Sequence, residues 1–288
     1  MKEYNADVCL KINASLGEGP LWDTEDNTLL WVNILENKLF RFNPKTGENK
    51  TVLTAPHVST VVKKESGGLV VTCRDGFYTY DEKSETLTAI TLPEKDNESV
   101  RFNDGKCDPA GRLWAGTMAY DTATGTGKLY CLDTNAELTT KLPAVTISNG
   151  LAWDDNKMYY IDSITRDIHI YDYELSSGNI SNQRSLFKVN EDGGLPDGCC
   201  LDNEGHLWVA FWGESMVRRI SPNGEEVARV HIKGASQVTA CAIGGDNMDT
   251  LFITTAAVEK DLNEEKNAGN LFSVKIDAKA APIYSFKN

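Results

Sequence analysis

A repeat of apolar strands and polar turns is the feature that most constrains the fold. Each copy contains an apolar run, an acidic or Asn-rich turn, a second apolar strand and a Gly-containing turn; four copies are clear and two are looser. The residue that leads the first strand recurs every 42 to 48 residues, at Gly19, Val61, Gly105, Gly150, Gly198 and Ala240. A repeat of about 40–50 residues made of strands and turns is typical of a propeller blade. The sequence therefore predicts an all-β, six-bladed β-propeller with a central channel.

The repeats account for most of the chain, so we expect residues 1–288 to form a single domain. Two strand-like segments, 8–12 and 282–286, lie outside the repeats. We expect one or both to pair across the junction of the ring, where they would cover an open sheet edge. The best helix candidate, residues 258–269, is short and lies in a connection.

Charge and cysteine content narrow the partners and the compartment. The formal net charge of -13 argues against nucleic acid and anionic membranes as partners. The N-terminus has no long apolar run, so we expect no signal peptide. The seven cysteines follow no zinc-binding spacing, which favours buried thiols in a reducing compartment and hence a cytoplasmic location. The role of the adjacent pair Cys199-Cys200 stays open.

In several repeats, an oxygen-bearing side chain occupies the same position relative to the first strand. Four of the six repeats place such a residue directly before the leading glycine, as Glu18, Asp104, Asn149 and Asp197, and Asn103 adds another. Such pairs are also ordinary turn chemistry, but the same offset in four repeats favours a shared site. Converging carboxylates repel one another unless a cation lies among them. Oxygen-only ligands favour Ca²⁺, Mg²⁺ or Mn²⁺, with Zn²⁺ and Fe²⁺ as alternatives.

The stretch RFNDGKCDPAGRLWAGTM adds charged residues that a turn does not require. Arg101 cannot bind a cation, so its position beside the acidic cluster favours a contact with substrate. Asp104 and Lys106 are expected to satisfy neighbouring backbone groups and a partner charge. Among the four histidines, His57 is the one that could face the channel.

These motifs also carry a family resemblance. SLGEGPLWD, RFNDGKCDPAGRLWAGTM, ISNGLAW, Pro196-Asp197-Gly198 and LWVAFWG together resemble the family of senescence marker protein (regucalcin), gluconolactonase and luciferin-regenerating enzyme, from about residue 14 to 285. The resemblance implies a six-bladed propeller that holds one divalent metal ion in its channel and hydrolyses sugar-acid lactones. The site residues that it implies are the metal ligands Glu18, Asn149 and Asp197 and the substrate contacts Arg101, Asn103 and, from GTMAYD, Asp121.

Lactone hydrolysis requires an electrophile at the carbonyl group and an activated water molecule. The resemblance makes Asp197 the catalytic base as well as a metal ligand, with a small-molecule lactone as the partner. Two alternatives stay open: an organophosphate or other ester hydrolase that uses the same metal site, and a non-catalytic calcium-binding propeller. The sequence leaves the identity of the lactone and the oligomeric state open.

Overall fold

The computed structural model describes residues 1–288 as strands joined by turns, with two short 3-10 helices, η1 (Ile34–Glu36) and η2 (Ser163–Thr165). No helix is long and apolar enough to span a bilayer. Four sheets each contain four consecutive strands. These are β2 (Gly17–Asp23), β3 (Thr28–Asn33), β4 (Lys38–Asn43) and β5 (Glu48–Thr54); β6 (Thr60–Lys63), β7 (Leu69–Cys73), β8 (Gly76–Asp81) and β9 (Thr86–Thr91); β10 (Val100–Cys107), β11 (Leu113–Ala119), β12 (Gly127–Leu132) and β13 (Leu138–Val145); and β14 (Ser148–Asp154), β15 (Lys157–Asp162), β16 (Asp167–Glu174) and β17 (Asn179–Lys188).

The remaining strands form one eight-stranded sheet in the order β18-β19-β20-β21-β1-β24-β23-β22. Its strands are β1 (Lys2–Leu10), β18 (Leu195–Leu201), β19 (Leu207–Trp212), β20 (Met216–Ile220), β21 (Glu226–Ile232), β22 (Val238–Gly244), β23 (Thr250–Thr255) and β24 (Leu271–Lys275). Strand β1 joins its two halves, because Lys2–Ala6 pairs in parallel with β21 and Asp7–Leu10 pairs antiparallel with β24. The N-terminal strand therefore covers edges that would otherwise be open, as the sequence led us to expect.

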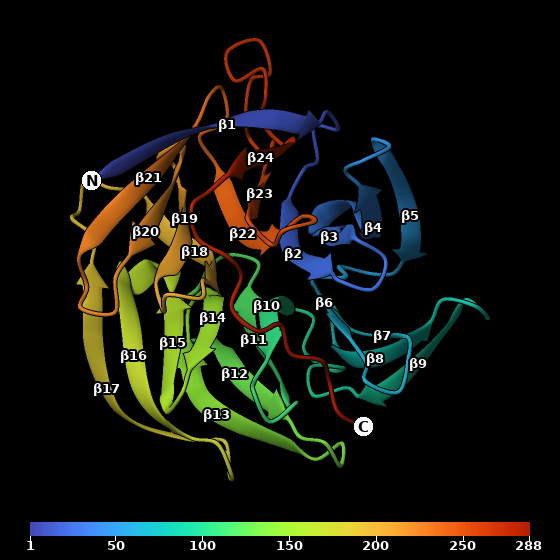
Figure 1. The fold of residues 1–288 in the computed structure, drawn as a ribbon. Coiled ribbons are helices and arrows are strands. Elements are labelled where there is room, and N and C mark those ends of the chain that lie inside the picture. The colour runs from blue at the N-terminus through green and yellow to red at the C-terminus, as the bar shows by residue number, and fades with distance from the viewer.

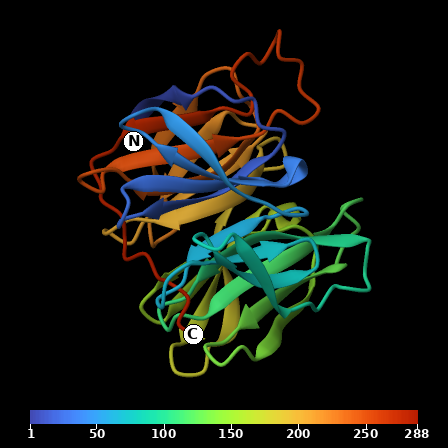
Figure 2. The same ribbon diagram turned by 90° about the vertical axis from the view of Figure 1, so that its right-hand side faces the viewer.

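The sheets are arranged around a central axis like the blades of a propeller (Figures 1 and 2). The strands β2, β6, β10, β14, β18 and β22 lie innermost, and each contacts the next around the ring until β22 returns to β2. Burial is high in the second strands of the sheets and low in the outermost ones: all five residues of β7 are buried, whereas the outermost strand β17 is mostly exposed. The fold thus brings the start of each innermost strand to one end of the channel.

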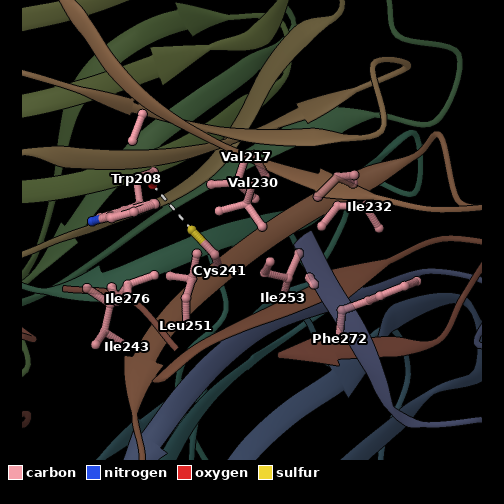
Figure 3. Packing of buried hydrophobic residues seen from close by; sticks show 14 of the residues in the cluster. Trp208, Val217, Val230, Ile232, Cys241, Ile243, Leu251, Ile253, Phe272 and Ile276 are labelled. Atoms are coloured by element: carbon pink, nitrogen blue, oxygen red, sulfur yellow. Dashed lines mark hydrogen bonds between the residues drawn. The ribbon is translucent and has the colours of Figure 1, made fainter. Parts of the chain in front are cut away.

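Hydrophobic clusters fill the spaces between neighbouring sheets. The largest contains 16 buried residues and packs the β18–β21 half of the long sheet against β22–β24 (Figure 3). Trp208, Val230, Ile253 and Phe272 are among its members, and the thiol of Cys241 donates a hydrogen bond of 3.3 Å to the carbonyl oxygen of Trp208. Each of the other clusters likewise draws residues from two adjacent sheets. Packing between sheets therefore closes the ring.

The C-terminal segment does not form the extra sheet strand that the sequence suggested. Ala281 donates a backbone hydrogen bond to Leu201, Phe286 bridges Lys64, and Lys287 bonds to Gly111. The segment crosses the end of the channel opposite the start of the innermost strands, as the red trace in Figure 1 shows. There it covers a small apolar cavity of about 90 Å³. The helix candidate at 258–269 forms turns instead of a helix.

A buried aspartate links two neighbouring sheets. Asp108, which has no exposed surface, accepts hydrogen bonds from the backbone of Ala110 and Arg112 and from the Trp114 indole at 2.9 Å. It also pairs with the Arg112 side chain at 2.7 Å and accepts a hydrogen bond of 2.8 Å from Tyr173 of the next sheet. Asp202 repeats the turn and indole contacts with Trp208. In each Asp-x-x-Gly-x-Leu-Trp segment, the hydrogen bonds that the aspartate accepts therefore stabilise a hairpin turn.

We expect Asp108→Ala to lower the free energy of unfolding by about 3–5 kcal/mol, because it leaves a buried guanidinium, a phenol and an indole without their acceptor. Asp133→Ala is the matched control. Asp133 accepts only two backbone hydrogen bonds in an equivalent turn, so its loss should cost about 1 kcal/mol. Denaturant unfolding of both variants measures the difference, and equal losses would contradict the assigned role of Asp108.

Candidate metal and substrate site

Four innermost strands bring the residues singled out in the sequence into one cavity. Glu18 comes from β2, Arg101 and Asn103 from β10, Asn149 from β14 and Asp197 from β18. All five are buried, with 3–6% of their surface exposed, and all five line a cavity of about 340 Å³. Buried charged side chains require partners, so their arrangement calls for a chemical explanation.

β-Bulges set the direction of these side chains. The pairing of β2 with β3 shifts between Glu18 and Leu21, and that of β10 with β11 shifts between Phe102 and Gly105. Strands β14 and β18 shift at the same offset, after Asn149 and after Pro196. A bulge leaves residues unpaired and redirects their side chains. The shared offset seen in the sequence is therefore a shared irregularity of the innermost strands.

The glycines at this offset let the strands approach closely. A Cβ atom on Gly150 would lie 2.8 Å from the carbonyl oxygen of Asp197, and one on Gly198 would lie 2.5 Å from the Cβ of Ala240. Both distances are shorter than normal contacts. Gly19 instead adopts a φ of 51°, which glycine accepts readily. Glycine is thus needed here for packing around the channel as well as for the turn.

We call the six buried polar residues that line the cavity its floor: Glu18, Arg101, Asn103, Asn149, Ser163 and Asp197. A chain of hydrogen bonds orients four of them. Arg101 Nη1 donates to Asn103 Oδ1 at 2.6 Å, and Asn103 Nδ2 donates to Asn149 Oδ1 at 2.8 Å. Asn149 Nδ2 then donates to Ser163 Oγ at 2.8 Å. The chain fixes which atom of each amide is the oxygen. In contrast, Asp197 Oδ1 is buried and has no hydrogen-bond partner.

The carboxyl groups of the floor disfavour one another's ionisation. Burial and, next, the charge of Asp104 raise the pKa of Glu18 to about 8. Burial and the charge of Glu18 likewise raise the pKa of Asp197 well above its usual value. The charge of Arg101 lowers both pKa values without cancelling these effects. Such a group of carboxylates is stabilised by an added cation.

Asp104 and Lys106 satisfy backbone groups, as expected from the sequence. Asp104 accepts a hydrogen bond of 2.7 Å from the Gly105 amide, and Lys106 Nζ donates to the carbonyl oxygen of Cys199 at 2.5 Å. Lys106 lines the small apolar cavity at the opposite end of the channel. Lys106 therefore lies toward the opposite end of the channel from Glu18 and Asp197.

Asp121 is not brought into the cavity. Its side chain is exposed and accepts a hydrogen bond of 3.0 Å from the Ala123 amide, while its neighbours Tyr120 and Thr122 line the cavity. Tyr120 donates to or accepts from His57 Nδ1 at 2.6 Å, which places His57 beside the cavity mouth. A turn after β11 explains the difference: Thr122 donates a backbone hydrogen bond to Ala119, so Tyr120 and Asp121 are the two central residues of the turn and point in different directions.

Ser163 is a site residue that no pattern in the sequence indicated. It lies in η2, after the second strand of its sheet, outside the offset shared by the other residues. Its hydroxyl accepts from Asn149 Nδ2 and donates to the carbonyl oxygen of Pro196 at 2.7 Å. Ser163 thereby connects the β14 and β18 sides of the floor.

The structure contains no group of three or more His, Cys, Asp and Glu side chains placed to hold a metal ion. Glu18 and Asp197 supply two carboxylates, and the third donor in the expected set is the amide oxygen of Asn149. Amide and carboxylate oxygens are ligands of hard cations. The unpartnered oxygen of Asp197 and the mutual effect of the carboxyl groups on their pKa values fit this set.

Comparison with known proteins gives consistent matches along the chain. The family model described as SMP-30/gluconolactonase/LRE-like region matches residues 16–257. A Bacillus subtilis protein, provisionally named as the sugar lactone lactonase YvrE, is 41% identical over 270 residues and 92% of each chain. Regucalcin of Oryctolagus cuniculus is 35% identical over 298 residues and 99% of each chain. A solved Agrobacterium tumefaciens structure, described as the calcium-binding protein regucalcin, matches with a TM-score of 0.95 over 100% of both chains at 25% identity.

Proposed function

Because the chain belongs to the SMP-30/gluconolactonase/LRE-like family, we propose that it is a divalent-metal-dependent hydrolase that opens sugar-acid lactones. The name of the Bacillus subtilis relative supports a lactonase. The observation that carries the proposal is the buried, unpartnered Asp197 Oδ1 in a cavity that also holds Glu18, Asn149 and Arg101. This combination offers oxygen ligands for a cation and a positively charged side chain for the substrate.

We assign Glu18, Asn149 and Asp197 as the protein ligands of one divalent ion. Their oxygens favour Ca²⁺, Mg²⁺ or Mn²⁺, with Zn²⁺ and Fe²⁺ as alternatives. When bound, such an ion would supply a Lewis acid for the lactone carbonyl group and for a water molecule. Three protein ligands leave room for both molecules, because Ca²⁺ commonly takes 6–8 oxygen ligands.

The side chains of the floor have distinct roles in this proposal. Asp197 takes a proton from the attacking water, since Oδ1 has no hydrogen bond to give up. Arg101 stabilises negative charge that develops as the ring opens, and Asn103 holds the guanidinium in place through its 2.6 Å hydrogen bond. Ser163 and Asn149 fix the geometry of the floor. Asp121 receives no role here, because it lies outside the cavity.

We also interpret the architecture as six blades in one domain of residues 1–288. The four four-stranded sheets would be four blades, and the eight-stranded sheet would comprise two more that share β1. Support comes from the ring of contacts between the innermost strands and from the hydrophobic clusters between adjacent sheets. The seven free cysteines support a reducing compartment such as the cytoplasm.

A non-catalytic calcium-binding protein is the second candidate, because the Agrobacterium tumefaciens relative is described as calcium-binding. A binding protein has no need for a buried guanidinium next to the cation. Arg101 opposes cation binding, since its positive charge lies in the same cavity as Glu18 and Asp197 and repels a divalent ion held there. Its presence therefore favours catalysis.

The metal assignment predicts opposite effects of one substitution with and without metal. In metal-free protein, Glu18→Gln should raise the melting temperature by about 2–6 °C, because it removes one of the converging buried carboxyl groups. With saturating Ca²⁺, Mg²⁺ or Mn²⁺ the wild type should melt at the higher temperature, since ligand binding stabilises only the folded state that binds it. Thermal unfolding with chelator and with each ion tests this, and the exposed Glu48→Gln is the control. A metal-dependent rise that is as large in Glu18→Gln as in the wild type would contradict the assignment.

A further inference from the structure

The walls of the cavity differ in chemistry from its floor. Eight of the fifteen lining residues are hydrophobic. They include Leu35, Met118, Tyr120, Ile147, Leu195 and Trp212. They come from the β2–β5, β10–β13 and β14–β17 sheets and from the eight-stranded sheet, or from the connections beside them. An apolar wall thus surrounds the polar floor on several sides.

The polar lining residues are almost all part of the floor. Glu18, Arg101, Asn103, Asn149, Ser163 and Asp197 either belong to the hydrogen-bonded chain or are assigned to the cation. Thr122 is the one remaining polar residue of the lining. A substrate hydroxyl held above the floor would therefore find few partners, and a buried hydroxyl without a hydrogen bond is costly.

Tyr120 illustrates how the wall differs from a sugar-binding surface. Its hydroxyl is hydrogen-bonded to His57 Nδ1 at 2.6 Å, and its ring is the larger surface that it offers to a ligand. Asp121, the carboxylate that would accept hydrogen bonds from sugar hydroxyls, is turned out to solvent. Tyr120 and Leu35 are also among the most exposed large hydrophobic residues, at 44% and 39%. Exposed apolar surface at a cavity mouth marks a site of binding.

The size of the cavity also exceeds that of a lactone ring. A cavity of roughly 150 Å³ accepts a benzene ring, which is close in size to a six-membered lactone. The cavity here measures about 340 Å³. It therefore has space for a substituent beside the ring, and that space is bordered by hydrophobic side chains.

From this arrangement we infer that the site, beyond the sugar-acid lactones proposed above, takes lactones that carry an apolar alkyl or aryl substituent and prefers them over polyhydroxylated aldonolactones. The inference rests on the proposed lactonase function, because it concerns the substrate of the same site. The polar floor binds the ester group, which is common to both kinds of lactone. The apolar wall contacts the substituent and sets the preference between them.

The test compares two six-membered lactones with the metal-loaded enzyme: δ-decalactone, with an alkyl chain and no hydroxyls, and glucono-δ-lactone. We expect kcat/KM for δ-decalactone to be at least about tenfold higher, after subtraction of the enzyme-free rates. If glucono-δ-lactone is hydrolysed at an equal or higher kcat/KM, the inference is wrong and the lactonase proposal stands. If neither lactone is hydrolysed above background with Ca²⁺, Mg²⁺, Mn²⁺ or Zn²⁺, the lactonase proposal fails and the inference fails with it.

Two variants at one position test the wall itself. Tyr120→Glu places a carboxylate at the mouth, so the ratio of the two kcat/KM values should shift toward glucono-δ-lactone by about tenfold. Tyr120→Phe keeps the ring and should keep the preference for δ-decalactone. Calorimetric metal affinity and melting temperature show whether the floor and the fold are intact in both variants. An unchanged ratio in folded, metal-binding Tyr120→Glu would overturn the role of the wall.

Discussion

Asp197→Ala should lower kcat/KM for lactone hydrolysis by about a thousandfold or more and weaken divalent-ion binding by at least about a hundredfold. The substitution removes one of the two carboxylates assigned to the cation and the oxygen assigned to accept the proton of water. Because Asp197 Oδ1 has no hydrogen bond in the structure, its removal breaks no contact of that atom. The protein should therefore remain folded, and the loss should be specific to the site.

Calorimetry with each divalent ion and steady-state kinetics measure the two effects separately. Asp7→Ala is the control, since Asp7 is an exposed carboxylate on β1, far from the innermost strands in the order of the sheet. It should leave both quantities within about twofold, as expected for a surface substitution. Unchanged metal affinity in Asp197→Ala would remove Asp197 from the ligand set, whatever its effect on kinetics.

Arg101→Ala should reduce kcat/KM by about 10²–10³ without weakening metal binding. The guanidinium is assigned to the substrate, so turnover depends on it. Its positive charge also repels a cation held by Glu18 and Asp197 in the same cavity, and the substitution removes this repulsion. We therefore expect the affinity for a divalent cation to stay equal or to increase slightly. This direction distinguishes a substrate contact from a structural residue.

Arg101→Lys is the matched variant, because it keeps the positive charge but loses the planar donor group. In the structure, Arg101 Nη1 donates to both Phe102 and Asn103, at 3.0 and 2.6 Å. A lysine cannot reproduce this fixed geometry, so the variant should keep a metal affinity close to that of the wild type and retain only part of the activity. Loss of metal with kinetics preserved in the remaining loaded protein would show that Arg101 supports the fold instead.

The repeat made the propeller-like arrangement predictable, because each copy carries its own strands and turns. The shared offset before glycine also predicted where Glu18, Asn149 and Asp197 would meet. The structure adds the reason, a β-bulge at that offset in each of these strands. This irregularity recurs in several repeats and is accompanied by a repeated sequence pattern, which is why this part of the site could be predicted.

Other features depend on contacts between residues far apart in the sequence, and no repeated sequence pattern indicates them. Ser163 reaches the floor from a short helix, and only the register of β14 against β15 places it near Asn149. The path of the C-terminal segment depends on single backbone contacts with Leu201, Lys63 and Gly111. The choice between Tyr120 and Asp121 depends on the direction of the chain after β11. None of these could be inferred from composition or spacing.

In the proposed function, a divalent cation held by the floor of this cavity is needed to open a lactone ring. Proton release from δ-decalactone and glucono-δ-lactone, measured with the metal-loaded protein and again after chelation, tests it most directly. We expect hydrolysis above the enzyme-free rate for at least one lactone, its loss with chelator and its return when metal is restored. A rate equal to the enzyme-free rate for both lactones, or a rate above it that chelation does not change, would contradict the claim.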